Sequence, residues 1–235
     1  MKLYLLPNSY TEEQLRDSEA IRTVLSGLGH TFTDKVDESE LIVSLGGDGA
    51  LLKAANAALE YDLPLIGINS GRLGHLCALR IEKIENFNEV LKKTKISNRT
   101  VLECSIEGKT YLALNDIIIS KTNFGQTVDL DVSIRKVRDF KMRGDGLIIS
   151  TPTGSTAYNI SAGGPIIDRT SPVLAITPIC AHNSDVYPLI INDDKQVLIK
   201  INHDKAEVYN DGVCCGIIDE ELIVKRSDRK LKLIV

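Results

Sequence analysis

The sequence has no long hydrophobic run. None of its apolar stretches reaches the roughly 18 residues that a membrane-spanning helix needs, so we expect no association with a membrane. The opening stretch MKLYLLPNSY is broken by Pro7 too soon to be a signal peptide. The 235-residue chain also has no excess of basic residues. Its net charge of −4 argues against a general nucleic-acid binder, which normally carries a broad basic face.

Patterns typical of disulfide frameworks and protein metal sites are missing as well. The cysteines are odd in number and include no C-x-x-C pair, so we expect reduced thiols and a cytoplasmic protein. The four histidines show no metal-ligand spacing, and no residue is assigned as a metal ligand.

The two halves of the chain have different hydrophobic rhythms. In the first hundred residues, short apolar strands alternate with helical patterns, which is typical of a parallel sheet covered on both faces. The strands are expected at residues 2–6, 41–45 and 65–68, and the helices at residues 11–28, 50–59 and 84–92. From about Arg99 the chain becomes a series of short, β-branched runs with turn signals between them. We therefore predict an α/β domain over residues 1–98 and a β-rich domain over residues 99–235.

One stretch of the β-rich half, residues 134–144, concentrates five basic residues and has two interpretations. The favoured one is a solvated edge strand whose charges prevent aggregation. The alternative is that these residues attract an anionic phosphate donor, with Arg143 as the best candidate because it directly precedes a Gly-Asp-Gly turn.

The segment SLGGDGA, residues 44–50, leads from a predicted strand into a predicted helix. Its glycines let the backbone approach a ligand, and the free N–H groups at the start of the helix favour phosphate. The Asp48 carboxylate would repel that phosphate, so we expect it to have a chemical role. It could accept a proton from an attacking hydroxyl, or it could bind that hydroxyl or Mg²⁺. The alternative is a tight turn in which Asp48 only caps the helix. A second glycine turn, INSGRLGHL at residues 68–76, would share one crevice with the first.

The most unusual segment is DGLIISTPTGSTAYNISAGGP, residues 145–165. It begins like a buried strand and continues as a run of Gly, Ser, Thr and Ala, which predicts a ligand-binding wall because hydroxyls bond without bulk and glycines allow close approach. Tyr158 offers a flat face for a base or nicotinamide ring, and Asp145 can bind ribose hydroxyls or an amide. The alternative is a turn that caps a short helix at residues 155–161.

Taken in order, GGDG, LND, DGLIISTPTGSTAYNISAGGP and TPICAHN resemble the NAD kinases over nearly the whole chain, from Leu41 to about Gly212. The resemblance implies phosphorylation of the adenosine-ribose 2′-hydroxyl of NAD, giving NADP, with ATP or polyphosphate as donor and Mg²⁺ or another divalent cation as cofactor. It also implies a sandwich-like second domain, and a homodimer or homotetramer in which subunits share sites.

The same resemblance assigns roles to individual residues. Asp48 matches the presumed general base, Gly49 its neighbour at NAD, and Gly46 and Gly47 the turn that holds the phosphate donor. Asn115 and Asp116 match the Asn-acid motif that holds the adenine and ribose region of NAD. Asp145 matches an acid that reaches the nicotinamide end, in a partner subunit. The remaining positions that line the NAD pocket are Thr153, Thr156, Ala157, Tyr158 and Ser161.

Three features depart from the family pattern. Ala50 stands where Thr is common, His75 stands where Phe is common, and the chain ends at KLKLIV where many relatives continue with a segment that returns to the first domain. Two alternatives stay open for these reasons. One is a non-catalytic NAD(P)-binding relative, and the other is a lipid or sugar kinase of the same superfamily, which would share GGDG but not TPTGSTAY.

Overall fold

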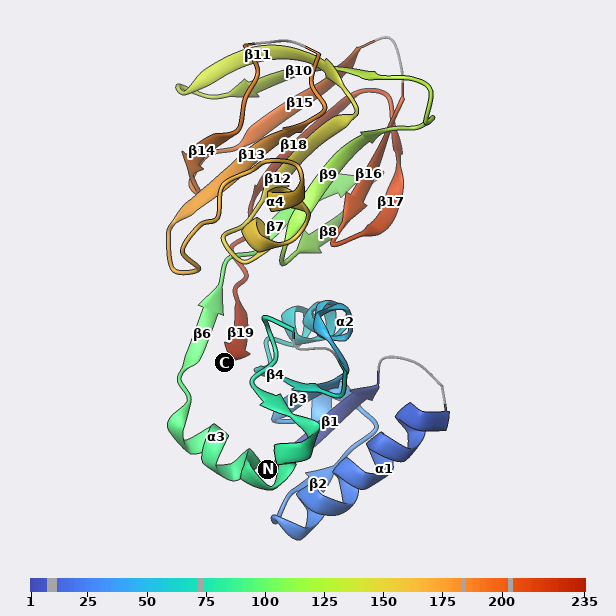
Figure 1. Ribbon diagram of the computed structural model, residues 1–235, viewed down its shortest axis with the longest axis vertical. Coiled ribbons are helices and arrows are strands. Elements are labelled where there is room, and N and C mark those ends of the chain that lie inside the picture. The colour runs from blue at the N-terminus through green and yellow to red at the C-terminus, as the bar shows by residue number, and fades with distance from the viewer. Residues whose placement is uncertain (8–11, 72–73, 183–184, 203–204) are drawn as a thin grey trace. The chain divides into compact units, whose positions relative to one another are not determined.

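The computed structural model describes residues 1–7, 12–71, 74–182, 185–202 and 205–235, which form two compact units (Figure 1). One unit contains residues 1–98 and 230–235, and the other contains residues 99–229. The chain passes from the first unit to the second at Arg99, and its last residues, 230–235, lie in the first unit rather than with residues 99–229.

The first unit is built on a seven-stranded, mostly parallel sheet in the order β2-β1-β3-β4-β19-β6, with β5 paired to β4. The strands are β1 (Lys2–Pro7), β2 (Thr31–Phe32), β3 (Leu41–Leu45), β4 (Leu65–Asn69), β5 (Leu79–Arg80), β6 (Ile96–Arg99) and β19 (Leu231–Ile234). The helices are α1 (Glu12–Gly27), α2 (Asp48–Glu60) and α3 (Phe87–Lys93), with short 3₁₀ turns at Val36–Glu38 and Ile81–Asn86. The strands and helices expected from the sequence of this half are present, although residues 84–86 of the third helix form part of a 3₁₀ turn. Strands β2, β5 and β6 were not expected.

Helices cover both faces of this sheet. Ile66 of β4 belongs to an apolar core that it shares with Ile21 of α1 and Phe87 of α3. Side chains alternate along a strand, so Gly67 faces the other way. A Cβ at Gly67 would lie 2.7 Å from Leu51 Cδ1 of α2. Thus α1 and α3 pack on one face, and α2 packs closely on the other because Gly67 has no side chain.

The C-terminal strand β19 takes a place between β4 and β6. Leu233 pairs with Leu65 and Ile234 with Ile66 in parallel register, and Lys232 Nζ binds the Asp62 carboxylate at 2.7 Å. The expectation that a returning segment is missing is therefore wrong: KLKLIV is itself the segment that returns to the first unit.

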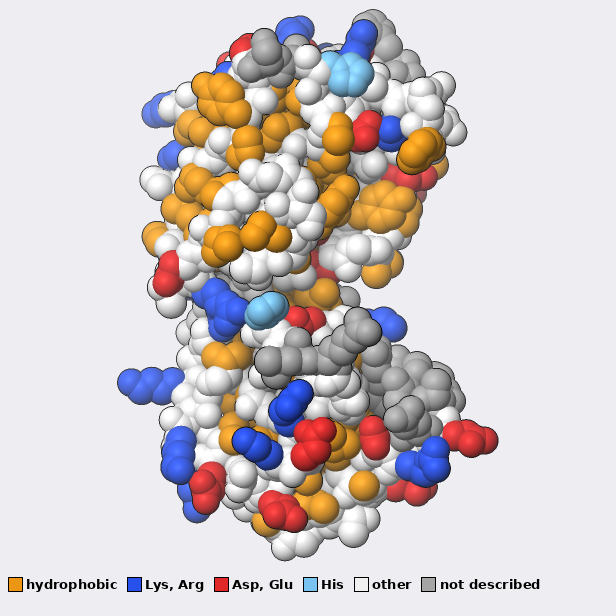
Figure 2. Space-filling model, viewed as in Figure 1, with side chains coloured by type: hydrophobic (Ala, Val, Ile, Leu, Met, Phe, Trp, Pro, Cys, Tyr) orange, Lys and Arg blue, Asp and Glu red, His pale blue; other side chains and the backbone are white. Residues whose placement is uncertain are grey.

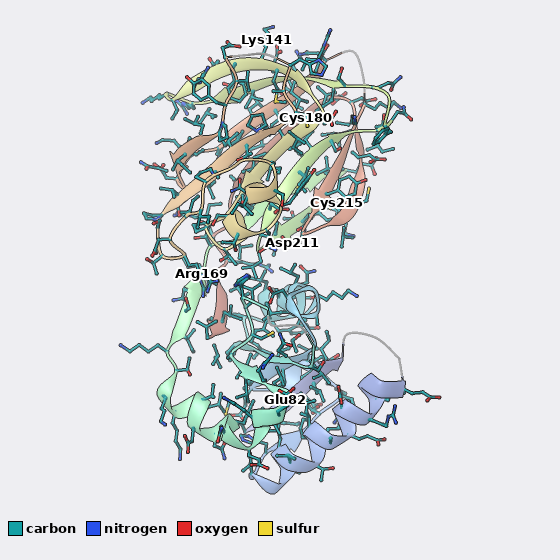
Figure 3. The ribbon with its side chains drawn as sticks, in the orientation of Figure 1. Glu82, Lys141, Arg169, Cys180, Asp211 and Cys215 are labelled. Atoms are coloured by element: carbon teal, nitrogen blue, oxygen red, sulfur yellow. The ribbon has the colours of Figure 1, made fainter. Side chains whose placement is uncertain are left out.

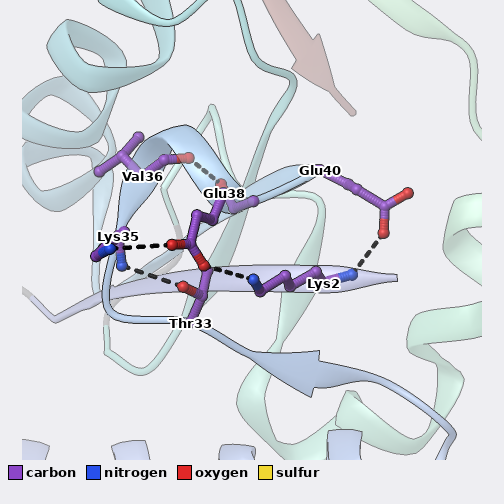
Figure 4. Close-up of polar contacts among 7 residues, drawn as sticks. Lys2, Thr33, Lys35, Val36, Glu38 and Glu40 are labelled. Carbon is purple, nitrogen blue, oxygen red and sulfur yellow. Dashed lines mark hydrogen bonds and ion pairs between the residues drawn. The ribbon is translucent and has the colours of Figure 1, made fainter.

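A charged cluster fastens the Val36–Glu38 turn to β1 (Figure 4). Lys2 Nζ donates to one carboxylate oxygen of Glu38 at 2.6 Å, and Lys35 Nζ lies 3.1 Å from the other oxygen. The backbone N–H of Lys2 donates to the Glu40 carboxylate at 2.6 Å. Hydrogen bonds from Lys2 and then Lys35 lower the pKa of Glu38, so this exposed carboxylate stays charged over a wide pH range.

The second unit is a β-sandwich of two six-stranded antiparallel sheets, in the orders β11-β10-β15-β18-β7-β8 and β14-β13-β12-β9-β16-β17. The first sheet contains β7 (Leu102–Ile106), β8 (Lys109–Ala113), β10 (Val128–Ile134), β11 (Arg138–Gly144), β15 (Val197–Asn202) and β18 (Glu221–Arg226). The second contains β9 (Asp116–Lys121), β12 (Gly146–Ser150), β13 (Val173–Ile179), β14 (Leu189–Asn192), β16 (Ala206–Asn210) and β17 (Val213–Ile218). One helical turn, α4 (Tyr158–Ser161), follows a 3₁₀ turn at Gly154–Thr156.

Apolar residues from both sheets form one core. Strand β10 shows the pattern: Leu130 and Val132 are buried in that core, while Asp129 and Asp131 alternate with them and are partly exposed. The predicted fold class, an α/β domain followed by an all-β, sandwich-like domain, is confirmed. Among the described residues, no helix is long and apolar enough to cross a bilayer.

Candidate active site

Asp48 is the first helical residue of α2, directly after the two glycines that follow β3. Gly47 is the N-cap, and no side chain closes the helix there. The Asp48 carboxylate instead accepts the backbone N–H of His75 at 2.9 Å and that of Leu76 at 3.1 Å, one on each oxygen. The alternative of a simple helix cap is therefore wrong. Asp48 joins the turn after β3 to the turn after β4.

The two glycine turns are packed against each other. Gly46, at a φ of 134°, donates its N–H to the carbonyl of Ile68 at 2.9 Å. A Cβ at Gly74 would lie 2.2 Å from Asp48 Oδ1, so only glycine at 74 leaves room for the carboxylate. Residues 72 and 73 of the second turn lie outside the described residues. The meeting of two turns beyond neighbouring parallel strands is the arrangement in which open α/β sheets bind ligands.

Cys77 lies beside this junction, with its thiol 3.6 Å from the carbonyl of Gly46. Burial, and then the negative charge of Asp48, raise the pKa of the Cys77 thiol to about 11. The thiol therefore stays protonated at neutral pH and is a poor nucleophile. All five cysteines are free thiols.

Two departures from the family pattern leave this junction intact. Ala50 is fully buried in α2, so its methyl group packs inside the first unit. The His75 side chain is exposed, and the residue holds Asp48 through its backbone N–H. That hydrogen bond does not depend on which side chain stands at position 75.

In the second unit, Asn115 and Asp116 lie at the corner where β8 ends and β9 begins. Among the described residues, the Asn115 side-chain amide has no hydrogen-bond partner, whereas Asp116 is only 4% exposed. Burial, followed by the nearby charge of Asp211, raises the pKa of Asp116 to about 7. The predicted pair therefore combines an amide free to bind a ligand with an acid that changes its charge near neutral pH.

Asp211, in the turn between β16 and β17, contacts this corner, and sequence reasoning missed it. Its carboxylate accepts three consecutive backbone N–H groups: Leu114 at 2.8 Å, Asn115 at 2.7 Å and Asp116 at 3.1 Å. Burial raises the pKa of Asp211, and these three hydrogen bonds oppose that rise. The Asp-Gly dipeptide signalled a turn in the sequence, but nothing in it signalled contact with residues more than ninety positions earlier.

The 151–165 segment uses its buried small residues to hold itself together. Thr151 Oγ1 donates to the carbonyl of Leu114 at 2.6 Å and accepts the N–H of Gly154 at 3.1 Å. A Cβ at Gly154 would lie 2.1 Å from the carbonyl oxygen of Asn115. Ser155 Oγ likewise accepts the N–H of Ile167 at 3.1 Å. These residues are a scaffold beneath the ligand wall that the sequence predicted.

Asn159 is the centre of this scaffold and was also missed. It is fully buried; its amide nitrogen donates to the carbonyls of Ser155 and Pro165 at 3.2 and 3.0 Å, and its oxygen accepts the Thr177 hydroxyl at 2.6 Å. The exposed side chains of the segment belong to Thr156, Tyr158, Ile160 and Ser161, and all of these except Ile160 were predicted to line the NAD pocket. Ala157 is half-buried, and Thr153 is only 4% exposed.

Comparison with known proteins agrees with this geometry. A model of the ATP-NAD kinase N-terminal domain matches residues 7–97, and a model of the ATP-NAD kinase C-terminal domain matches residues 114–235. The chain belongs to the NAD kinase family. The NAD kinase of Sulfurimonas denitrificans is 31% identical over 99% of this chain and 84% of its own length. The NAD kinase of Caldicellulosiruptor saccharolyticus is 38% identical over 82% of this chain and 75% of its own.

Solved structures share the fold. An NAD kinase from Archaeoglobus fulgidus in complex with ATP superposes with a TM-score of 0.84 at 23% identity, covering 100% of this chain and 94% of that one. Yeast NADH kinase complexed with NADH gives a TM-score of 0.85 at 23% identity, covering 98% of this chain and 82% of that one. The family, the fold and the kinase class predicted from the sequence are confirmed.

Two predicted site residues of this NAD kinase family member are engaged in ion pairs within the second unit. Arg143 on the edge strand β11 binds Asp129 on β10, with Nε 2.6 Å from Oδ1. This pairing favours the edge-strand interpretation over a role at the phosphate donor. Asp145 binds Lys121 Nζ at 2.6 Å, and its side chain is 37% exposed. Asp145 therefore keeps an accessible carboxylate, as the predicted contact with a nicotinamide end requires.

Few side chains that could bind a metal ion lie close together in the described parts of the chain. Among the residues that the structure describes, no group of three or more His, Cys, Asp or Glu side chains gathers at one point. Mg²⁺ differs from most protein-bound metals because it keeps several waters and is held by one or two carboxylates together with substrate phosphates. A single carboxylate such as Asp48 fits a cation of this kind, which enters with a nucleotide.

Proposed function

We propose that this chain transfers the γ-phosphoryl group of ATP to the 2′-hydroxyl of the adenosine ribose of NAD. The observation that carries the proposal is the Asp48 carboxylate, fixed by two backbone N–H groups where two glycine turns meet. Each of its oxygens accepts one of these bonds and has a second lone pair available. Asp48 can therefore accept a hydroxyl proton without losing its position.

The proposed reaction is an in-line displacement. The ribose 2′-hydroxyl gives its proton to Asp48 as its oxygen forms a bond to the γ-phosphorus. The bond between that phosphorus and the β–γ bridging oxygen breaks, and ADP leaves. Gly47 and the N-terminal end of α2 supply backbone N–H groups for the donor's phosphates. Gly46 shapes this turn, because its own N–H is bonded to the carbonyl of Ile68. Mg²⁺ bound to these phosphates would neutralise their charge.

NAD is bound, in this proposal, by residues of the second unit. The free amide of Asn115 and the carboxyl of Asp116 hold the adenosine ribose and base. The exposed face of the 151–165 segment contributes Tyr158 for stacking, with Thr156 and Ser161 for hydrogen bonds. Ala157 and Thr153 complete this part of the site by the family resemblance, and Asp145 binds the nicotinamide end of a dinucleotide held by a partner subunit.

We also propose a cytoplasmic homodimer or homotetramer. Figure 2 shows apolar side chains gathered on the face of the second unit that carries α4, β13 and β14. Large exposed apolar residues there include Ile160, Ile166, Tyr187 and Ile190. An apolar surface of this kind is typical of a subunit contact. Light scattering coupled to gel filtration gives the oligomeric state, and a monomer at micromolar concentration would refute this part.

The activity is tested by incubating the protein with NAD, Mg²⁺ and ATP, and then detecting NADP with an NADP-specific dehydrogenase. Parallel reactions replace ATP by polyphosphate, NAD by NADH, and NAD by diacylglycerol or a sugar phosphate. We expect NADP from ATP and NAD, and no product from the lipid or the sugar. Tight NAD or NADP binding without NADP formation would instead identify a non-catalytic relative.

A further inference from the structure

The turn between β16 and β17 has one residue with an unusual backbone. Asp211 has a φ of 46°, in the left-handed region that few non-glycine residues adopt (Figure 3). Asp-Gly, like Asn-Gly, is a common pair in two-residue hairpin turns with this backbone. The turn itself therefore accounts for a short polar residue at position 211, but it would accept an uncharged asparagine equally well.

The carboxylate is explained by the backbone that it faces. It accepts the N–H groups of Leu114, Asn115 and Asp116, and the N–H of Asp211 donates back to the carbonyl of Asp116 at 3.1 Å. A carboxylate only accepts hydrogen bonds, so it suits three converging donors. An asparagine would place an NH₂ group against one of them.

The backbone of residues 114–116 is also held by Thr151. Thr151 donates its hydroxyl to the carbonyl of Leu114 and its backbone N–H to the carbonyl of Asn115 at 2.9 Å. The backbone of residues 114–116 is therefore fixed by two different elements. In contrast, the Asn115 side-chain amide has no partner among the described residues. The structure fixes the main chain and leaves the side chain available for a ligand, which is the arrangement of a preorganised binding site.

This arrangement also has a cost. Asp211 adds a second buried carboxyl beside Asp116, and burial together with their mutual repulsion raises the pKa of Asp116. A neutral residue at 211 would remove the repulsion. The presence of the acid at this position thus indicates that its three hydrogen bonds matter more than the charge that they bring.

We propose that Asp211 is a positioning residue, which holds the Asn115–Asp116 segment in the conformation that binds NAD. The inference rests on the proposed function, because Asn115 and Asp116 are assigned there as ligands of NAD. Asp211 acts through the backbone of these residues and makes no contact with the reacting atoms. It should therefore affect the binding of NAD more than the rate of phosphoryl transfer.

Steady-state kinetics of Asp211→Asn and Asp211→Ala test this role. We expect the KM for NAD to rise about tenfold for Asn and about a hundredfold for Ala, since Asn retains one acceptor oxygen and charged hydrogen bonds are strong. The kcat should stay within about threefold of the wild type. Asp194→Asn is the matched control, because Asp194 is exposed and contacts Lys195 at the surface. This control should leave both constants unchanged.

Hydrogen exchange of the backbone amides gives a second measurement that needs no substrate. In Asp211→Asn and Asp211→Ala, the amides of Leu114, Asn115 and Asp116 should exchange at least tenfold faster than in the wild type, while those of the distant strand β10 are unchanged. Unchanged exchange in a folded variant would overturn the proposal, and so would a loss of kcat at constant KM. If the wild type formed no NADP but these amides responded, the proposed function would fail while the structural role of Asp211 stood. If Asp211→Ala did not fold, the Asn variant would decide both measurements.

Discussion

Asp48 in the first unit and Asp211 in the second unit both hold a distant turn by accepting consecutive backbone N–H groups. Asp48 holds two amides that lie 27 and 28 residues later, and Asp211 holds three that lie 95–97 residues earlier. Their neighbours differ. Asp48 lies near the protonated thiol of Cys77, whereas Asp211 lies near another buried acid, Asp116. The same hydrogen-bonding geometry therefore occurs in two different surroundings, and the proposed roles differ: Asp48 accepts a proton, and Asp211 positions other residues.

The largest effect is expected for Asp48→Asn. Asparagine keeps the shape of the side chain but cannot accept the ribose proton, so kcat should fall about a hundredfold to ten-thousandfold. The affinity for NAD should change by less than about threefold, because the residues proposed to hold NAD through its adenosine part are in the second unit. Initial rates of NADP formation and calorimetric titration with NAD measure the two quantities. Unchanged turnover would remove Asp48 from its proposed role and leave it equivalent to Asp211.

Gly154, which lies against the backbone of Asn115, and Gly74, which lies against the side chain of Asp48, should respond differently to an added methyl group. At Gly154 the methyl would meet the backbone of Asn115 at 2.1 Å, so Gly154→Ala should lower the free energy of unfolding by about 3 kcal/mol. At Gly74 it would meet the end of the Asp48 side chain at 2.2 Å, and a side chain can rotate away. Gly74→Ala should therefore lower turnover about tenfold and stability by only about 1 kcal/mol.

Gly125→Ala is the control for this pair, because an added methyl there would meet no atom within 4 Å. Urea denaturation and NADP formation are measured for all three variants. If Gly74→Ala lost as much stability as Gly154→Ala, the contrast between a movable side chain and a fixed backbone would be wrong.

The acid pair in the second unit predicts a dependence of stability on pH. Because the pKa of Asp116 is raised to about 7 in the folded protein and lies near 4 in the unfolded chain, folding favours its protonated form. Its contribution to stability is fully present below about pH 4 and is lost as the pH rises through about 7. Asp116→Asn stays neutral, so it should gain on the order of 2 kcal/mol relative to the wild type between pH 5 and pH 8. Parallel stability curves for the two proteins would refute the raised pKa.

Local patterns in the sequence were sufficient for much of this molecule. Strand β3 was predicted at its observed residues, and the GGDG turn was placed correctly between a strand and a helix, because periodicity and glycine content are local properties. Strand β19 was not predicted, and the range 99–235 included its residues with the second domain, because an apolar run does not show which sheet it joins. The contact of Asp211 with Asn115 could not be predicted, because it depends on how β16 lies beside β9 in the folded sandwich.

The distinction between local sequence patterns and long-range packing also applies to the 151–165 segment. Its composition predicted a ligand wall, and the exposed Tyr158 and Ser161 are placed as such a wall requires. The hydroxyls of Thr151 and Ser155 are instead buried and bonded to the backbone. Sequence composition does not separate these two groups, because burial is decided by packing against β9 and β13 rather than by residue type.

The smallest effect is expected for Thr177→Val, which tests a neutral counterpart of the two aspartate contacts. The Thr177 hydroxyl donates to Asn159 Oδ1 at 2.6 Å, and both residues are fully buried. Valine has nearly the same shape, so the change removes one neutral hydrogen bond and leaves the amide oxygen unpaired, at a cost of about 1 kcal/mol. Thr110→Val, on the exposed side of β8, is the control and should be close to neutral. Urea denaturation of both variants gives the two changes in the free energy of unfolding. If Thr177→Val cost as much as Gly154→Ala, a neutral hydrogen bond would stabilise this segment as strongly as its backbone packing does.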